Sequence, residues 1–413
     1  MTTVNNSFDY EHELNRTGEF LKKYQGIWSY EVLNEYPQGL TNFKPEWLDF
    51  LRTLSPHEQW QIECRNGDFK SSLSQLFNEI ISYENIPQLP REIDQQYPSW
   101  AFQKVSQKKE HEIKGIVALL SSCHKIKGSK VLDIGGGAGH LGRILALYHG
   151  AHVTSIDTNS DFQERGKKRL GKYPKPETAG TLKFINHHFS ADKKKELSLM
   201  TENNLSIGLH TCGPLALEHL NLLFDKPTAK AINFGCCYQK LNLESDIMLS
   251  SQSKVIGLKY TKYALTLATR GNHFISENDF ELKKKVKLYR AALHLYLAEK
   301  HNINLFESVG SSPPRVYRSD FSVYAKDKLP EHLKDIVTES ELNLFYQRSD
   351  IQEIITNIYL ANIIRWQFSR VLEKYLLLDR AQWLREQGVQ TSLYQVFDSQ
   401  ISPRNIALVC NIK

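Results

Sequence analysis

Short apolar runs of strand-like composition recur through the middle of the chain, and stretches with helical spacing separate them. The runs are VLDIG (131–135), HVTSID (152–157), TLKFIN (181–186), LSIGLH (205–210) and AKAINFG (229–235). Strands that alternate with helices of about ten to fifteen residues indicate a parallel sheet, covered on both faces and joined by right-handed crossovers. The pattern therefore predicts a doubly wound α/β core.

The segments before this core have helical patterns. Residues 8–105 are rich in aromatic side chains at helical spacing and predict a helical N-terminal segment. Between residues 107 and 123, Ile113, Ile116 and Leu120 fall on one face, which predicts a helix that leads into the first strand.

The segments after the core are more mixed. Residues 255–300 look helical and basic, and residues 315–326 (RVYRSDFSVYAK), after a Pro-Pro pair, are a candidate late strand that suits an edge hairpin. Residues 329–387 are mostly helical, and the chain closes with a turn and the strand-like run IALVCNIK. We therefore expect a helical region over 1–105, the α/β core with a helical insertion over 106–328, and a helical extension that closes in a strand over 329–413.

Composition places the chain among globular proteins. Of 413 residues, 41% are hydrophobic and 24% are charged, no apolar run has the length of a membrane span, and the first residues have no secretory pattern. Six cysteines without a disulfide spacing predict reduced thiols. We expect a soluble, cytoplasmic protein with no membrane partner; its oligomeric state stays open, and the net charge of +6 says little about partners.

The candidate chemistry begins after the first predicted strand. Asp133 precedes the glycines 135, 136, 137 and 139, and a helix is expected to begin near His140. A glycine-rich turn at a helix N-terminus lets the backbone approach a ligand closely, so a nucleotide-type cofactor is implied. Asp157, at the end of the second strand, is placed to accept hydrogen bonds from ribose hydroxyls.

Two cofactors fit this turn. Residues 137–142 also spell the dinucleotide fingerprint, which leaves NAD as an alternative. Asp133 argues against it, because a carboxylate at this point would repel a pyrophosphate but attract the cationic amino acid end and sulfonium of S-adenosylmethionine. A tight structural turn with no ligand is the third interpretation.

A second polar group of residues follows the fourth and fifth strands, where the crevice of a parallel sheet is expected. The candidates for the acceptor side are His210, Thr211, Cys212, Cys236, Cys237 and Tyr238. Packing alone can account for part of this group. No metal is expected, because adjacent cysteines chelate poorly and no C-x-x-C spacing occurs. A nucleophilic Cys212 or Cys236 stays open.

These motifs resemble the methyltransferase-like protein 25 family, which carries RNA-methyltransferase labels. The matching stretches are SQKKEHEI (106–113), VLDIGGGAGHLGRILA (131–146), GLHTCGPLA (208–216), FGCCYQKL (234–241), LLLDRAQWLREQ (376–387) and FDSQISPRNIALV (397–409). The paired motifs around the cysteines also resemble those of an enzyme that methylates a ribose 2′-hydroxyl in transfer RNA. The chain departs from the family at Pro214, where an acidic residue is common, and at Gln239, where histidine is frequent.

The resemblance implies a class I Rossmann-like fold: a mainly parallel seven-stranded sheet whose last strand is antiparallel. It implies that S-adenosylmethionine binds at Asp133, Gly135, Gly137, Gly139 and Asp157. From their position we add His140 and His210 to the cofactor side. Catalysis is assigned to His210, Cys212 and Tyr238, and substrate contact to Thr211, Cys236 and Cys237.

The expected function is methyl transfer to RNA. His210 is the candidate base for a hydroxyl acceptor, because a histidine ordinarily titrates near neutral pH. Basic residues that could contact phosphates are Lys259, Lys262, Arg270, Lys283, Lys284, Lys285, Lys287 and Arg290. A protein or peptide acceptor and a non-catalytic, cofactor-binding scaffold are the alternatives.

Overall fold

A computed structural model of the chain describes residues 8–64, 71–89, 96–190, 192–203, 205–270, 275–303 and 309–412. The chain forms two compact units. The sheet unit comprises Met1–Lys23, Tyr83–His273 and Ser369–Lys413, and the helical unit comprises Tyr24–Ser82 and Phe274–Phe368. This division differs from the three consecutive segments expected over 1–105, 106–328 and 329–413, because each unit is assembled from segments that are far apart in the sequence.

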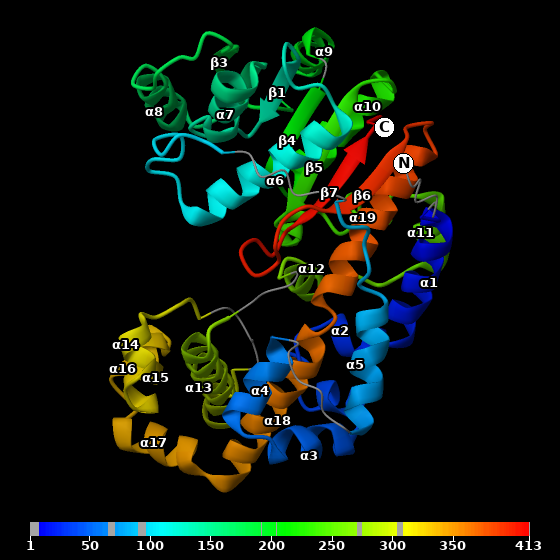
Figure 1. The fold of residues 1–413 in the computed structure, drawn as a ribbon. Helices are drawn as coiled ribbons and strands as arrows, with labels where there is room; N and C mark the ends of the chain where they lie inside the picture. The colour runs from blue at the N-terminus through cyan, green and yellow to red at the C-terminus, as the bar shows by residue number, and fades with distance from the viewer. Residues whose placement is uncertain are drawn as a thin grey trace. The chain divides into compact units, whose positions relative to one another are not determined.

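The sheet unit contains a mixed sheet of seven strands (Figure 1). The strands are β1 (Lys130–Ile134), β2 (His152–Asp157), β3 (Thr181–Asn186), β4 (Leu205–Cys212), β5 (Lys230–Cys236), β6 (Thr391–Gln395) and β7 (Ile406–Cys410), in the order β3-β2-β1-β4-β5-β7-β6. Neighbours among β1 to β5 are parallel, and β7 is antiparallel to both β5 and β6. The five predicted core strands and the strand-like run at the chain's end are confirmed, and β6 was not predicted.

Alternating side chains of β4 show why both faces of the sheet are covered. Ile207 belongs to the apolar core that α6 (Gln107–Cys123) and α7 (His140–His149) share with the strands. Ser206, on the opposite face, contacts His219 of α10 (Pro214–Asp225), with 2.7 Å between its Oγ and the His219 Nε2. Because strand side chains alternate between faces, the sheet lies between two helical layers.

The remaining helices of the sheet unit frame this core. They are α1 (Tyr10–Lys23), α8 (Ser160–Leu170), α9 (Lys193–Glu202), the short 3₁₀ helix η2 (Tyr238–Lys240), α11 (Ser251–Ile256), α12 (Lys262–Ala268) and α19 (Ser369–Arg385). The first and last of them are joined by an ion pair between Lys374, which is fully buried, and Glu13, with 2.7 Å between Nζ and Oε2. The N-terminal helix is thus fixed to the helix that precedes β6.

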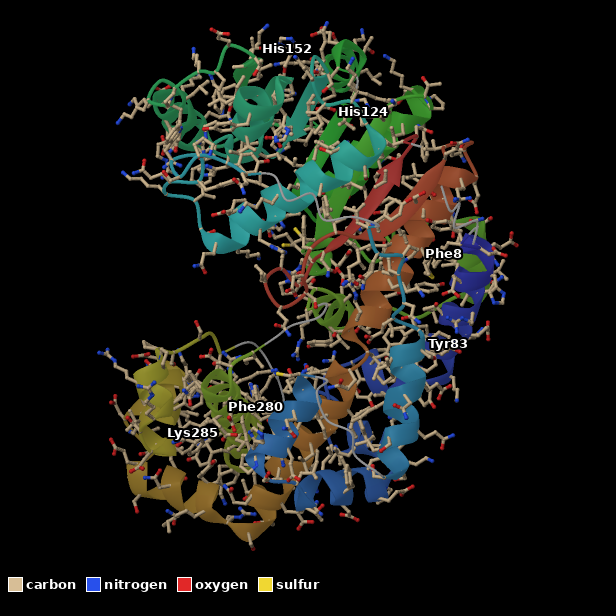
Figure 2. All side chains as sticks on the ribbon, in the orientation of Figure 1. Phe8, Tyr83, His124, His152, Phe280 and Lys285 are labelled. Atoms are coloured by element: carbon tan, nitrogen blue, oxygen red, sulfur yellow. The ribbon has the colours of Figure 1, made fainter. Side chains whose placement is uncertain are left out.

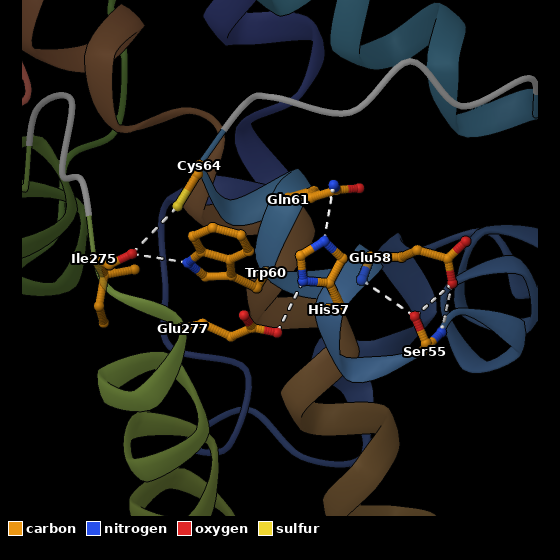
Figure 3. A network of polar contacts seen from close by, with 8 residues as sticks. All are labelled: Ser55, His57, Glu58, Trp60, Gln61, Cys64, Ile275 and Glu277. Atoms are coloured by element: carbon orange, nitrogen blue, oxygen red, sulfur yellow. Dashed lines mark hydrogen bonds and ion pairs between the residues drawn. The ribbon is translucent and has the colours of Figure 1, made fainter.

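The described part of the helical unit is built from helices alone. They are α2 (Gln25–Trp28), η1 (Gln38–Asn42), α3 (Pro45–Thr53), α4 (Pro56–Glu63), α5 (Ser72–Ser82), α13 (Glu277–His301), α14 (Pro314–Tyr317), α15 (Phe321–Lys328), α16 (Glu331–Lys334), α17 (Glu339–Gln347) and α18 (Ser349–Trp366). Figure 3 shows how α4 begins and is held: Ser55 and Glu58 form a reciprocal capping box, and the Trp60 indole donates to the carbonyl of Ile275 at 2.8 Å. His57 pairs with Glu277 at 2.9 Å in the same network.

One sequence prediction is wrong in this unit. The candidate strand over 315–326 is helical, as α14 and α15. Its buried large side chains, Tyr317, Phe321 and Tyr324, are four and three residues apart, so helical spacing outweighed the β-branched and aromatic composition. The helical expectation around 255–300 is met by α11, α12 and α13.

Among the described residues, none of the helices combines the length and the apolar character needed to span a bilayer.

Candidate functional site

The glycine turn after β1 has the backbone geometry that its sequence predicts. Gly135, Gly137 and Gly139 have φ angles of 69°, 57° and 67°, which side-chain-bearing residues rarely adopt. The amides of Gly135 and Gly136 both donate to the carbonyl of Ile156 in β2, at 2.9 and 3.0 Å. The turn is therefore fastened across the sheet before α7 begins.

Gly136 is required for space, although the sequence analysis did not single it out. A Cβ at this position would lie 2.2 Å from the Ser155 Oγ and 2.5 Å from the Asp133 Oδ2. Both distances are far below van der Waals contact. The side chain of Asp133 therefore reaches the turn only because residue 136 is a glycine.

The turn forms one wall of a pocket of about 390 Å³. Its lining residues are Lys104, Lys109, Asp133, Gly135, Gly136, Gly137, Ala138, His140, Leu141, Phe162, Arg165, Arg169, Leu209 and His210. Among the residues predicted for the cofactor, Asp133, Gly135, Gly137, His140 and His210 line this pocket, whereas Gly139 and Asp157 do not. Gly139 instead packs under the turn, where a Cβ would lie 2.5 Å from the Phe184 ring.

Asp133 is the most unusual group of the pocket. It is only 2% exposed, and its Oδ2 has no hydrogen-bond partner among the described residues. Burial raises the pKa of this carboxyl to about 7; the charge of Lys109 acts against that rise and the charge of Asp157 adds to it. A buried carboxyl oxygen that lacks a partner favours a cationic ligand group in the pocket.

Asp157 ends β2, as the sequence predicts, and stabilises the turn from outside the pocket. Its Oδ2 accepts a hydrogen bond from the Gly137 amide at 2.9 Å, and its Oδ1 accepts one from the Asn159 amide at 2.8 Å. A carboxylate oxygen can accept more than one hydrogen bond, so these contacts leave capacity for ribose hydroxyls.

The opposite rim of the pocket is basic. His140 lies 3.3 Å from Arg169, measured between Nε2 and Nη1, and burial together with the charges of Arg169, Arg143 and Lys109 lowers the pKa of His140 to about 4. The imidazole of His140 is therefore neutral at physiological pH. The positive charge of this rim comes from lysine and arginine side chains.

His210 is paired with a residue that the sequence analysis missed. The backbone of His210 has a φ of 62° at a bulge in β4, and its Nε2 lies 2.9 Å from the Oε1 of Glu112 in α6. Glu112 is fully buried, and Ser402 and Lys109 also contact its carboxylate, both at 2.8 Å. Sequence gave one signal for Glu112: it is an acid next to the apolar face of a predicted helix.

The charge state of Glu112 follows from these contacts. Burial alone would raise its pKa, but the hydrogen bond and charge of His210 and the charge of Lys109 outweigh burial and hold the pKa at about 2. Glu112 is thus ionised at all physiological pH values. An ionised carboxylate accepts a hydrogen bond from the Nε2–H of His210, and Nδ1 is then the nitrogen that can accept a proton from another group.

The three cysteines at the ends of β4 and β5 converge. The Cys212 Sγ lies 3.3 Å from the Sγ atoms of both Cys236 and Cys237. The hydrogen bond with Cys236 lowers the pKa of Cys212 to about 5, whereas the hydrogen bond to Cys212 and burial raise the pKa of Cys236. The cluster therefore favours a thiolate on Cys212.

Of the six predicted acceptor residues only His210 lines the pocket; the three cysteines lie in the cluster described above, and Tyr238 and Thr211 are buried. Tyr238 is fully buried, burial raises the pKa of its phenol, and its hydroxyl has no partner among the described residues. Thr211 is also buried, and its hydroxyl donates to the Phe234 carbonyl at 3.3 Å. The expectation that His210, Cys212 and Tyr238 share one crevice is corrected: His210 lines the pocket, and Tyr238 packs in the interior.

Comparisons with known proteins bear on the same part of the chain. Residues 108–244 match a family described as a methyltransferase domain. Over 234 residues the chain is 26% identical to "Probable methyltransferase-like protein 25" of Mus musculus, a match that covers 50% of this chain and 37% of the mouse protein. The chain thus matches well under half the length of this relative. The matched domain includes the glycine turn, Asp133, Glu112, His210 and all three clustered cysteines.

Proposed function

Because this chain carries a methyltransferase domain and is similar to methyltransferase-like protein 25, we propose that it transfers a methyl group from S-adenosylmethionine to RNA. We further propose that its core is a class I Rossmann-like methyltransferase fold. The seven-stranded, mostly parallel sheet with an antiparallel β7 supports that assignment.

The buried carboxyl of Asp133, whose Oδ2 has no hydrogen-bond partner among the described residues, carries the cofactor assignment. S-adenosylmethionine has an ammonium group and a sulfonium, and both favour a carboxylate in a pocket with little water. The negatively charged pyrophosphate of a dinucleotide would instead be repelled by this carboxylate. Asp133 therefore favours a ligand with a cationic group at this point of the pocket over NAD.

The residues that would hold S-adenosylmethionine can be named. Asp133 would bind the cationic end, the backbone of Gly135 to Gly137 would allow close approach, and Asp157 would accept from the ribose hydroxyls. When bound, the cofactor supplies a methyl group that its sulfonium already activates for displacement. The chain itself needs only to align the acceptor, remove its proton and exclude water.

His210 is the proposed base for an acceptor hydroxyl. Its side chain lines the pocket and is 27% exposed, while its partner Glu112 is fully buried. Glu112 accepts a hydrogen bond from Nε2 of the imidazole and so favours a proton on that nitrogen. The other nitrogen, Nδ1, is then available to accept the proton of the acceptor hydroxyl. Glu112 is therefore a positioning residue in this proposal.

The basic rim of the pocket supports an RNA acceptor. Arg165 and Arg169 lie on α8 and line the pocket, and the exposed Lys167 and Lys168 belong to the same helix. Clustered cations near an active pocket suit a polyanionic substrate. In this proposal α8 contacts the phosphates that flank the methylated nucleotide.

The basic segment predicted from sequence, 259–290, supports RNA binding less well. Lys283 forms an ion pair with Glu63 at 2.5 Å, and Lys287 forms one with Glu31 at 3.4 Å. Lys285, labelled in Figure 2, lies over the ring of Tyr289. These side chains already have partners inside the helical unit, so the proposed RNA contact is placed on α8.

Incubation of the purified chain with methyl-labelled S-adenosylmethionine, cell RNA and cell protein tests this proposal. We expect label in RNA, and loss of that label in Gly136→Ala, whose Cβ would displace Asp133. Gly171→Ala is the matched control, because the backbone of Gly171 is helical and a Cβ there would meet its nearest atom at 3.8 Å.

The outcomes separate the two parts of the proposal. Label in polypeptides alone would overturn the RNA acceptor and keep the methyl transfer. An absence of label in every fraction, with no binding of the cofactor, would overturn the assignment as a methyltransferase.

A further inference from the structure

The cysteine cluster at the carboxyl ends of β4 and β5 has no role in the proposed methyl transfer. We propose that Cys212, Cys236 and Cys237 bind a thiophilic divalent cation of the zinc class through three thiolates, with a fourth coordination position open. The three sulfur atoms lie within 4.8 Å of one another, and no other group of cysteine, histidine and acidic side chains in the described ranges converges in this way.

The backbone bends at Cys237, after β5, and at Gly213, after β4, and these bends bring the sulfurs together. Adjacent residues of an extended strand point to opposite faces, so Cys236 and Cys237 would diverge if the strand continued. Cys237, however, adopts a left-handed conformation with φ 53° and ψ 47°, and this rotates its side chain back toward Cys212. A non-glycine residue rarely adopts this conformation and keeps it only where the surroundings enforce it.

The loop after β4 is fixed to the loop after β5. Gly213 has φ 57° and ψ −125°, a conformation suited to glycine, and its amide donates to the Cys236 carbonyl at 2.9 Å. The Cys237 carbonyl in turn accepts from the Lys240 amide at 2.9 Å. Both loops are therefore held in register before any ligand binds, as a preformed site requires.

The sulfur separations match a tetrahedral ion. Zinc–sulfur bonds of about 2.3 Å place the sulfurs of a tetrahedral site about 3.8 Å apart. Cys212 lies 3.3 Å from each of its neighbours, so shifts of about half an ångström would complete the geometry. A disulfide would instead need an S–S bond of about 2.05 Å between one pair and would leave the third sulfur unused.

Nearby cations balance the charge of the proposed site. Three thiolates and one divalent cation have a net charge of minus one. Arg380 is buried, its Nη1 has no hydrogen-bond partner among the described residues, and this atom would lie 2.6 Å from a Cβ added at Gly235, the residue before Cys236. The carboxylates of Asp379 and Asp246 already act on this guanidinium, and the anionic site would add negative charge beside its Nη1.

The open position indicates what kind of site this is. Three protein ligands with a free position are typical of catalytic zinc sites, whereas structural sites have four. Cys212 and Cys237 are only partly buried, so an ion can enter and a water or a substrate heteroatom can occupy the fourth position. His210 is engaged with Glu112 and is not the fourth ligand.

Metal content and cobalt substitution test this site on the full chain. We expect one equivalent of zinc after incubation with zinc chloride and dialysis, and a thiolate-to-metal absorption band when cobalt(II) replaces zinc. Cys212→Ser should lose both signals. Cys64→Ser and Cys123→Ser are the matched controls, because these partly buried thiols lie outside the cluster, and both should keep one equivalent.

A second measurement does not depend on how any variant folds. In the unmodified chain, zinc should protect Cys212 and Cys237 from alkylation and leave Cys64 and Cys123 as reactive as before. Zinc that fails to bind, or that protects no clustered cysteine, overturns the proposal. So does a disulfide between two clustered cysteines in the zinc-loaded protein. None of these readouts uses S-adenosylmethionine, so their failure is distinct from failure of the proposed methyl transfer.

Discussion

The affinity for the cofactor is predicted to depend on pH through Asp133. The pKa of its carboxyl is raised to about 7, so the group gains a proton as the pH falls through that value. Protonated, it no longer attracts the ammonium group of the ligand. Affinity should therefore be highest above neutral pH and should fall on the acidic side.

The size of this effect follows from the ionised fraction. With a pKa of about 7, roughly three-quarters of the carboxyl is ionised at pH 7.5 and about 3% at pH 5.5. If only the ionised form binds the cation, affinity drops by about 25-fold across this range, close to 2 kcal/mol. His140 adds nothing here, because its pKa of about 4 keeps it neutral throughout.

Isothermal titration calorimetry with S-adenosylhomocysteine measures this dependence, because the product keeps the ammonium group and is chemically stable. Asp133→Asn is the matched control, as it preserves shape and removes the charge. At pH 7.5 it should bind about 10–100-fold more weakly, the range expected for loss of a hydrogen bond to a charged group. An equal pH slope in Asp133→Asn, or a wild-type affinity that is constant from pH 7.5 to 5.5, would refute the reasoning.

Three further predictions concern stability and catalysis. Asp133→Asn should stabilise the ligand-free protein above pH 7 and should have no such effect below about pH 4. The pKa of Asp133 is raised in the folded state, so ionisation of this carboxyl destabilises the fold as the pH rises through 7. Urea unfolding at several pH values checks this. Glu112→Gln should lower kcat by up to about 100-fold with the cofactor affinity retained, because the imidazole of His210 loses the carboxylate that positions it; steady-state kinetics with calorimetry decide it. Lys283→Ala should destabilise the protein by about 1–3 kcal/mol, because it removes the ion pair between Lys283 and the buried carboxylate of Glu63, and cofactor binding should not change; denaturant unfolding measures the first effect and calorimetry the second.

Local sequence patterns were enough to predict the sheet core and the glycine turn. The five core strands have short runs of strand-like composition between helical stretches, and the turn has glycines at each position where φ is positive, so both can be read from local sequence. The β6 strand was missed because TSLYQ is short and half polar, and it becomes a strand only by pairing with β7. The candidate strand over 315–326 failed for the opposite reason: its packing against distant helices favours the helical period.

The paired groups of the site could not be predicted from local pattern. Glu112, His210 and Ser402 meet only after α6, β4 and the loop before β7 have packed together. The cysteine cluster depends on the left-handed backbone of Cys237, which reverses the rule that adjacent strand residues point apart. Tyr238 was assigned to the crevice because its neighbours in sequence were. In the structure the bend at Cys237 is followed by a 3₁₀ turn, and this turn buries Tyr238.

A crystal structure of the chain with S-adenosylhomocysteine tests the central claim most directly. The account predicts that the ligand occupies the pocket beside the glycine turn, with its ammonium group within hydrogen-bond distance of the Asp133 carboxylate, its ribose against Asp157 and its sulfur toward the side of the pocket formed by His210. A ligand bound elsewhere, or an ammonium group directed away from Asp133, would contradict it.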